Sequence, residues 1–374
     1  MAKRVSLLRS LSERWRPIYR PRWNSLRSKL IFETNNDYRS AVFLSAAART
    51  GSTWISETIN YRNDYRYLFE PISLYRYLLT DRYRPLLPGP EEGIIARSPY
   101  HFVHDREPID TRLQYIRPSD KDPELRARAE AVLTGKFKNP AVDQYNYTPR
   151  IVFRRRLIKE TKSGLWLRWL YEQFPGLKIV HLIRHPVPTI QSRLEGKADN
   201  DPALRMRYFR KLIFGQPDLV ADWLEPFRGL LESATTVFEQ RMAVWCIQNY
   251  VPLRQFEPGE IHLAFYEDFC IEPVESLRKL FAYIGEPTDD RTMMRALGKM
   301  NAPSSTVHGR TMGEIAGSGR IDGMKQVSKW QARATEDQIA VADRFLKAFG
   351  MDALYTVTDP LPRQGGTLAL STSH

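Results

Sequence analysis

Short apolar runs alternate with longer segments of helical periodicity along most of this chain. The apolar runs have the length and composition of strands buried on both faces, and they cover residues 41–47, 151–158, 178–183 and 261–266. Helical patterns cover residues 52–61, 163–174, 235–256 and 273–284, and a further helix starts near Pro188. This alternation predicts an α/β fold with a mostly parallel central sheet and helices on both faces.

The same pattern predicts three regions. Residues 1–37 form a basic N-terminal arm, residues 38–356 a single α/β domain, and residues 357–374 a loose tail with few apolar side chains. Within the domain, residues 98–150 are charged, mixed and proline-containing, which predicts an insertion over the sheet. No internal repeat is visible.

Positive charge is concentrated at one end of the chain. Of the formal net charge of +13, residues 1–30 carry nine basic side chains and one acidic one, a net of +8 that leaves about +5 for the rest. A nucleic-acid-binding domain would spread its charge more evenly, so we expect no nucleic-acid partner. The arm has an apolar stripe at helical spacing, formed by Leu8, Leu11, Trp15 and Ile18. The stripe indicates either peripheral membrane contact or packing on the body. The Arg-rich, acid-poor composition of the arm also resembles that of a transit peptide.

Several classes of protein are disfavoured by composition. No apolar run approaches the roughly 18 residues of a membrane span, and no secretory signal is visible, so we expect a cytoplasmic location. The two cysteines, Cys246 and Cys270, lack the spacing of metal ligands, and we expect both to be buried free thiols.

The segment SAAARTGSTW, residues 45–54, is the first with recognisable chemistry. A buried strand ends there, Gly51 permits a tight turn, and Ser52 and Thr53 open a helix whose N–H groups point at one spot. This arrangement suits an oxyanion, although an ordinary strand–turn–helix connection with N-cap hydroxyls has the same pattern. It is not a Walker A loop, because Ala46 stands at the first glycine position and Ser52 replaces the lysine.

A second candidate anchor lies in VHLIRHPVPTIQSRL, residues 180–194. Arg184 follows a predicted strand, at the edge where open α/β sheets bind ligands, and its planar fork suits a phosphate dianion. Ser192, eight positions later on the next helix, offers a second donor. A structural salt bridge at Arg184 is the alternative interpretation.

The two segments together resemble the nucleotide signatures of the sulfotransferases that use 3′-phosphoadenylyl sulfate (PAPS). RTGSTW is similar to their 5′-phosphosulfate loop, and Arg184 with Ser192 is similar to their 3′-phosphate motif. The resemblance covers about residues 40–356 and is closer to the carbohydrate and bacterial branches. It implies PAPS as the sulfuryl donor, adenosine 3′,5′-bisphosphate as the product, and no metal.

The resemblance also implies a set of site residues. Trp54 and Tyr266, the latter in FYEDFCIEPVESLRKLFAYIGEP, match aromatic residues near the adenine, and GRIDGMKQVSKW (residues 319–330) resembles a basic loop that closes over the nucleotide. Arg49 takes the place of the catalytic cation. The implied donor-binding residues are Arg49, Thr50, Gly51, Ser52, Thr53, Trp54, Arg184, Ser192, Tyr266, Arg320, Lys325 and Lys329.

The acceptor is less clearly indicated. Glu70, in LFEP, resembles a glutamate of carbohydrate sulfotransferases and is the first candidate for the general base; His101, His104 and Glu160 are the alternatives. A histidine segment of the cytosolic type is not obvious, which argues against a phenol and favours a carbohydrate-like acceptor. We expect transfer to a hydroxyl (or amine) group of a carbohydrate, a glycolipid or a small alcohol. The competing functions are a kinase-like phosphotransferase and a non-catalytic, basic, anion-binding protein.

Overall fold

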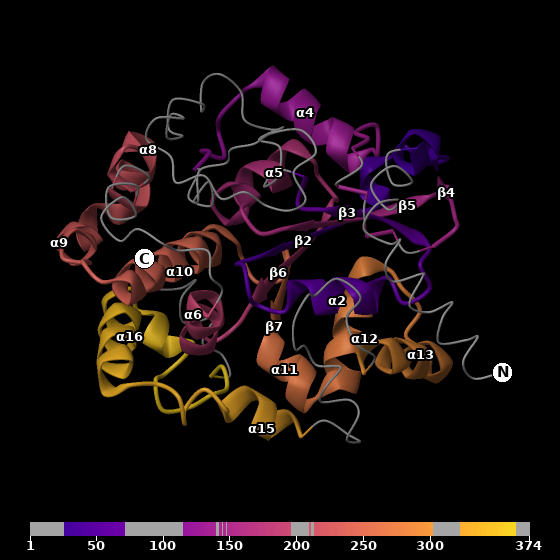
Figure 1. Cartoon of the computed structure of the whole chain (residues 1–374). Coiled ribbons are helices and arrows are strands. Elements are labelled where there is room, and N and C mark those ends of the chain that lie inside the picture. The colour runs from indigo at the N-terminus through magenta and orange to yellow at the C-terminus, as the bar shows by residue number, and fades with distance from the viewer. Residues whose placement is uncertain are drawn as a thin grey trace, which may run out of the picture.

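The computed structural model describes residues 26–71, 115–139, 142–143, 145–146, 148–195, 209–210, 213–301 and 322–363. Its centre is a five-stranded sheet in the order β3-β5-β2-β6-β7, with every neighbouring pair parallel (Figure 1). The strands are β2 (Ala41–Ala46), β3 (Tyr65–Phe69), β5 (Arg155–Glu160), β6 (Lys178–Ile183) and β7 (His262–Phe265). The predicted α/β fold with a parallel sheet is confirmed.

The sheet is buried because helices pack on both of its faces (Figure 1). Alternate residues of β2 divide between two cores. Val42 and Leu44 pack with α2 (Ser52–Ile59), α12 (Pro273–Ile284) and α13 (Asp290–Met300), whereas Phe43 packs with α4 (Pro123–Leu133) and α5 (Leu167–Gln173). A third core, around α6 (Pro186–Leu194), α10 (Val237–Gln255) and α16 (Glu336–Ala348), includes Ile183 at the end of β6. All six residues of β2 are buried, as its uninterrupted apolar run predicts.

The helices of the described chain differ greatly in length. The longest, α10, begins with a capping box at Thr236 and Glu239, and α12 ends at Gly285, whose φ is 76°. The α-helices are α2 (Ser52–Ile59), α4 (Pro123–Leu133), α5 (Leu167–Gln173), α6 (Pro186–Leu194), α8 (Pro217–Leu219), α9 (Arg228–Glu232), α10 (Val237–Gln255), α11 (Tyr266–Ile271), α12 (Pro273–Ile284), α13 (Asp290–Met300), α15 (Gly323–Ser328) and α16 (Glu336–Ala348). Shorter 3₁₀ or π turns are η1 (Tyr38–Ser40), η4 (Gly164–Trp166), η5 (Val220–Leu224), η6 (Glu225–Phe227) and η7 (Met351–Ala353).

Two strand assignments differ from the sequence prediction. The run 151–158 is divided: β4 (Val152–Phe153) pairs with β1 (Phe32–Glu33) in a separate two-stranded sheet, and β5 starts only at Arg155. Strand β3 was not predicted at all. Its sequence, YRYLF, has an arginine in its middle, and a charged residue in a fully buried strand is normally excluded unless it is paired.

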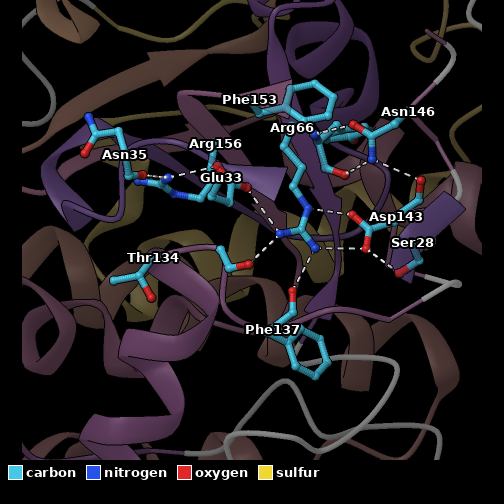
Figure 2. A network of polar contacts seen from close by, with 12 residues as sticks. Ser28, Glu33, Asn35, Arg66, Thr134, Phe137, Asp143, Asn146, Phe153 and Arg156 are labelled. Atoms are coloured by element: carbon cyan, nitrogen blue, oxygen red, sulfur yellow. Dashed lines mark hydrogen bonds and ion pairs between the residues drawn. The ribbon is translucent and has the colours of Figure 1, made fainter. Parts of the chain in front are cut away.

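Figure 2 shows how that arginine is accommodated. Arg66 of β3 and Arg156 of β5 are register partners, and both are fully buried. The Arg66 guanidinium donates to both oxygens of Asp143, at 2.8 and 2.9 Å, and to Glu33 at 3.2 Å. It also donates to the carbonyl oxygens of Gly135 and Phe137.

Arg156 extends the same network toward the N-terminal segment. Its guanidinium donates to Glu33 at 3.2 Å and to the carbonyl oxygens of Leu133, Asn35 and Asp37. The two arginines therefore fasten the segment after α4 and the segment before β2 to the sheet. Every donor of this network satisfies a backbone or carboxylate acceptor, so we interpret it as structural rather than as an anion site.

Both cysteines are buried and free, as predicted. Among the described helices, none combines the length and apolarity that crossing a bilayer requires.

Candidate functional site

The carboxyl ends of all five sheet strands meet at one edge, because the strands are parallel. The loop 47–51 follows β2, Arg184 follows β6 and Tyr266 follows β7. On the other side of β2, Glu160 ends β5 and Glu70 follows β3. Residues that are far apart in sequence, and that the sequence analysis singled out, are thus brought to the same edge.

The loop after β2 has a strained, specific backbone. Arg49 has a φ of 73° and Gly51 a φ of 88°, both in the left-handed region, and the Thr50 hydroxyl donates to the Ala47 carbonyl at 2.8 Å. A Cβ added to Gly51 would lie 2.6 Å from the ring of Tyr266. Glycine is therefore required twice over at this position, once by the backbone and once by the aromatic ring packed against it. Ser52 and Thr53 open α2 directly after this turn.

Arg49, Arg184 and Ser192 are neighbours. The Arg49 Nε donates to the Ser192 Oγ at 3.0 Å, and the Arg184 guanidinium donates to the Arg49 carbonyl oxygen at 3.0 Å. The two predicted phosphate anchors thus lie at adjacent strand ends and are directly connected.

The electrostatics of this group favour an anion. Partial burial and the charge of Arg184 lower the pKa of Arg49, and the same two causes lower the pKa of Lys329, so three cations converge. Within the described part of the chain, none of the three forms an ion pair with a carboxylate, and the buried Arg184 Nε has no hydrogen-bond partner. Like charges held together without a carboxylate at ion-pair distance are characteristic of an anion-binding site. We refer to Arg49, Arg184 and Lys329 as the cationic cluster.

The aromatic residues lie directly beneath the cationic cluster. The Arg184 guanidinium lies 4.3 Å from the ring centroid of Tyr266, whose hydroxyl accepts a hydrogen bond from Gln326 at 3.1 Å. The Trp54 ring is 5.6 Å from that of Tyr266, and its indole N–H donates to the Met300 carbonyl at 2.8 Å. Only 8% of Trp54 is exposed, so the packing shows a core residue; its stacking on adenine stays a prediction.

Glu70 lies on the other side of the loop and is held by Lys159. The Lys159 ammonium group forms an ion pair with the Glu70 Oε1 and lies 4.5 Å from the ring centroid of Phe69. The backbone of Glu70 has a φ of 46°, and its N–H donates to the Lys159 carbonyl at 2.7 Å. Three non-glycine residues in the described chain have positive φ, and two of them are Arg49 and Glu70. Strain of this kind often accompanies functional sites.

The remaining predicted residues either make other contacts, are exposed, or lie outside the described part of the chain. The Glu160 carboxylate is buried and accepts backbone N–H groups from Thr161 and Lys162, which indicates a turn-capping role. Lys329 donates to Gln326 at 2.9 Å, and Lys325 is exposed on α15. Three predicted residues, His101, His104 and Arg320, lie outside the described residues.

The sequence analysis missed two features of the site. The first is the ion pair between Lys159, near the end of β5, and Glu70, which no motif indicated. Glu267, next to Tyr266, is buried beneath the cationic cluster, and burial raises its pKa to about 7. The sequence did contain one indication that Glu267 lies at the site, because it directly follows Tyr266 at the end of a predicted strand.

A parallel α/β sheet with a cationic cluster at a strand–loop–helix turn has an arrangement that suits an anionic ligand. The model of the sulfotransferase family matches residues 41–290, two thirds of the chain, and the chain belongs to that family. Transfer of a sulfuryl group is accordingly its general activity. No curated protein sequence matches the chain.

Several solved structures are similar. The sulfotransferase domain of the olefin synthase from Synechococcus PCC 7002 has 18% identity and a TM-score of 0.41, covering 84% of this chain and 96% of that one. The mouse sulfotransferase SULT7A1, complexed with PAP, has 13% identity and a TM-score of 0.40, with coverages of 92% and 91%. A sulfotransferase from Alicyclobacillus acidocaldarius has 14% identity and a TM-score of 0.33, with coverages of 84% and 97%.

Proposed function

We propose that the protein transfers the sulfuryl group of PAPS to a hydroxyl (or amine) group of a carbohydrate, a glycolipid or a small alcohol. The observation that carries the proposal is the cationic cluster, because Arg49 and Arg184 approach each other from neighbouring strand ends without a carboxylate between them. A bisphosphorylated nucleotide presents two anionic groups that two such anchors can hold together.

Arg49 and the turn after it bind the donor's 5′ side. The donor supplies an activated sulfuryl group whose leaving group is a phosphate. Negative charge grows on the bridging oxygen as the sulfur–oxygen bond breaks, and the Arg49 guanidinium neutralises it. The N–H groups at the start of α2 and the hydroxyls of Ser52 and Thr53 bind the same phosphate. Arg184, Ser192 and Lys329 then hold the 3′-phosphate.

Glu70 serves as the general base in this proposal. It lies two strands from β2, on the side opposite Arg184, so the acceptor enters from the side away from the nucleotide's 3′ end. Lys159 holds the Oε1 of Glu70, and the proposal assigns Oε2 to the acceptor's hydroxyl proton. The acceptor oxygen forms the new bond to sulfur while its proton passes to Glu70.

The proposal requires no metal ion. Among the described residues, no group of three or more His, Cys, Asp or Glu side chains could hold a metal ion. Residues 1–25 of the basic arm lie outside the described residues, and contact of the arm with a membrane surface is a proposal, as is a cytoplasmic location.

Incubation with labelled PAPS and a panel of glycans, glycolipids and small alcohols tests this function. Arg49→Ala should lower turnover about 10²- to 10³-fold, because it removes a charge aimed at the leaving group. Arg126→Ala is the matched control, since Arg126 is an exposed arginine of α4 that pairs with Glu130 and lies over the ring of Phe174, and neither partner belongs to the site. Wild-type turnover in the Arg49→Ala variant would show that the role given to Arg49 is wrong.

The donor is tested separately by thermal shift. Adenosine 3′,5′-bisphosphate should stabilise the protein at concentrations where ATP with Mg²⁺ does not, because only the former has a 3′-phosphate for Arg184. Stabilisation by ATP alone would favour the kinase-like function instead.

A further inference from the structure

Three chain segments pass through the site in the same manner. In each, one residue belongs to the cationic cluster or, in the case of Tyr266, packs against it, and the next residue in sequence is buried behind it. The pairs are Arg184 and His185 after β6, Tyr266 and Glu267 at the start of α11, and Lys329 and Trp330 after α15. Behind the site, His185, Glu267 and Trp330 meet Tyr355 of the C-terminal segment, and we call these four residues the buried box.

Glu267 is the polar centre of the buried box. Its side chain is buried; Oε1 accepts the backbone N–H of His185 at 2.9 Å, and Oε2 accepts the hydroxyl of Tyr355 at 2.8 Å. Tyr355 is itself fully buried. One carboxyl group thus connects the segment after β6 to the segment after β7 and to the C-terminal segment.

His185 completes the connection. Its ring lies nearly parallel to that of Trp330, with centroids 4.4 Å apart, and edge-on to that of Tyr355 at 5.1 Å. Its Nε2 lies 2.9 Å from the Thr356 carbonyl oxygen, and its Nδ1 accepts the N–H of Val187. These partners assign a neutral ring with the proton on Nε2, in line with a pKa that burial lowers to about 4. His185 is also the N-cap of α6, the helix that carries Ser192.

We propose that Glu267 and Tyr355 are positioning residues for the anion held by Arg184, so that the C-terminal segment is a working part of the nucleotide site. Neither residue touches the anion in this proposal. The inference rests on the proposed function only in naming that anion as the 3′-phosphate.

The physical reason is that the backbone between Arg184 and His185 has few other supports. The Glu267 carboxyl holds its N–H, and Trp245 donates to the Arg184 carbonyl at 3.1 Å. If Glu267 loses the hydroxyl of Tyr355, it can turn away and leave the buried N–H of His185 without an acceptor. The backbone would then shift to satisfy that N–H, and the Arg184 side chain would move with it.

Glu267 also makes anion binding depend on pH. Burial raises its pKa to about 7, against the lowering effects of His185 N–H, Arg184 and Tyr355. The titratable and charged groups around it are Arg184 and His185 after β6, Cys270 on α11, Lys329 after α15, and Tyr355. An anion bound at Arg184 offsets the positive charge that favours ionised Glu267, so binding raises this pKa further and takes up a proton. Binding must therefore weaken as the pH rises through about 7.

Tyr355→Phe is the sharpest test, because it removes one hydroxyl and keeps the ring. The Kd of adenosine 3′,5′-bisphosphate, measured by calorimetry, should rise about tenfold, the scale of one charge-assisted hydrogen bond. Tyr65→Phe is the matched control: Tyr65 is also fully buried and donates to a buried carboxylate, Glu286, at 2.6 Å, but it lies at the start of β3. Its Kd should stay at the wild-type value.

The pH profile separates positioning from simple loss of stability. The wild-type Kd should rise between about pH 6 and 8 relative to that of Glu267→Gln, which has no charge to titrate. In Tyr355→Phe the step should move to higher pH, since the carboxylate has lost a donor. The proposal is overturned if Tyr355→Phe binds as tightly as Tyr65→Phe, or if the wild-type and Glu267→Gln profiles are parallel.

Inorganic phosphate serves as a second probe for the same variants. Failure of the wild-type protein to bind the bisphosphate while it binds phosphate would refute the proposed donor. The Kd of inorganic phosphate, compared between the same variants, would then still test the positioning roles of Glu267 and Tyr355.

Discussion

Gly51→Ala tests the packing of the phosphate loop most directly. The residue has a φ of 88°, and its new Cβ would lie 2.6 and 2.7 Å from two ring carbons of Tyr266. The left-handed backbone should cost about 1–2 kcal/mol for any L-residue. Forcing the buried ring aside should add about 1–3 kcal/mol, as other overpacked cores do. We therefore expect the free energy of unfolding to fall by about 2–5 kcal/mol.

The displaced ring should also affect the ligand. Tyr266 supports the Arg184 guanidinium at 4.3 Å, so moving it disturbs a cation–π contact at the anion site. Loss of that contact corresponds to a Kd for adenosine 3′,5′-bisphosphate that is about 3- to 30-fold higher. Urea denaturation followed by circular dichroism measures the first effect, and calorimetry the second.

Gly285→Ala provides the control. Gly285 has a similar φ of 76°, but an added Cβ there would meet nothing within 4 Å. It should therefore show the backbone cost alone, about 1–2 kcal/mol, with unchanged nucleotide affinity. If Gly51→Ala is as stable as Gly285→Ala and binds the nucleotide normally, the close packing of the loop on Tyr266 does not govern the site.

Two further predictions concern the acceptor side and the sheet. Glu70→Gln should lower turnover about 10²- to 10⁴-fold and leave the Kd of the bisphosphate unchanged, which steady-state kinetics and calorimetry check together; an unaltered pH–rate profile would remove Glu70 from the mechanism. Arg66→Met should lower the free energy of unfolding by about 3–5 kcal/mol, because it leaves the buried carboxylate of Asp143 without its ion-pair partner and removes one of the two arginines paired with Glu33. Urea denaturation measures that loss, and a change within error of zero would contradict the structural role of the network in Figure 2.

The sequence predicted secondary structure correctly where the residues of a single segment determine it. The runs at 41–47 and 178–183 became β2 and β6 because an uninterrupted apolar strand can only be buried between two layers of helices. The helix predicted at 273–284 matches α12 at both ends, where Pro273 and Gly285 act as start and stop signals. The strand–turn–helix pattern around Gly51, and the family to which it points, could be read in the same way.

Contacts between distant segments decided the rest. Strand β3 could not be predicted because Arg66 interrupts its apolar run. Arg66 can be buried only because the carboxylates of Asp143 and Glu33, from distant segments, pair with it. Lys159 and Glu70 are 89 positions apart, and Glu267 and Tyr355 are 88 apart, so no local pattern could reveal either pair. The sequence by itself determined which residue types end each strand. The order β3-β5-β2-β6-β7 determined which of them meet, because neighbouring strands place their ends within reach of each other's side chains.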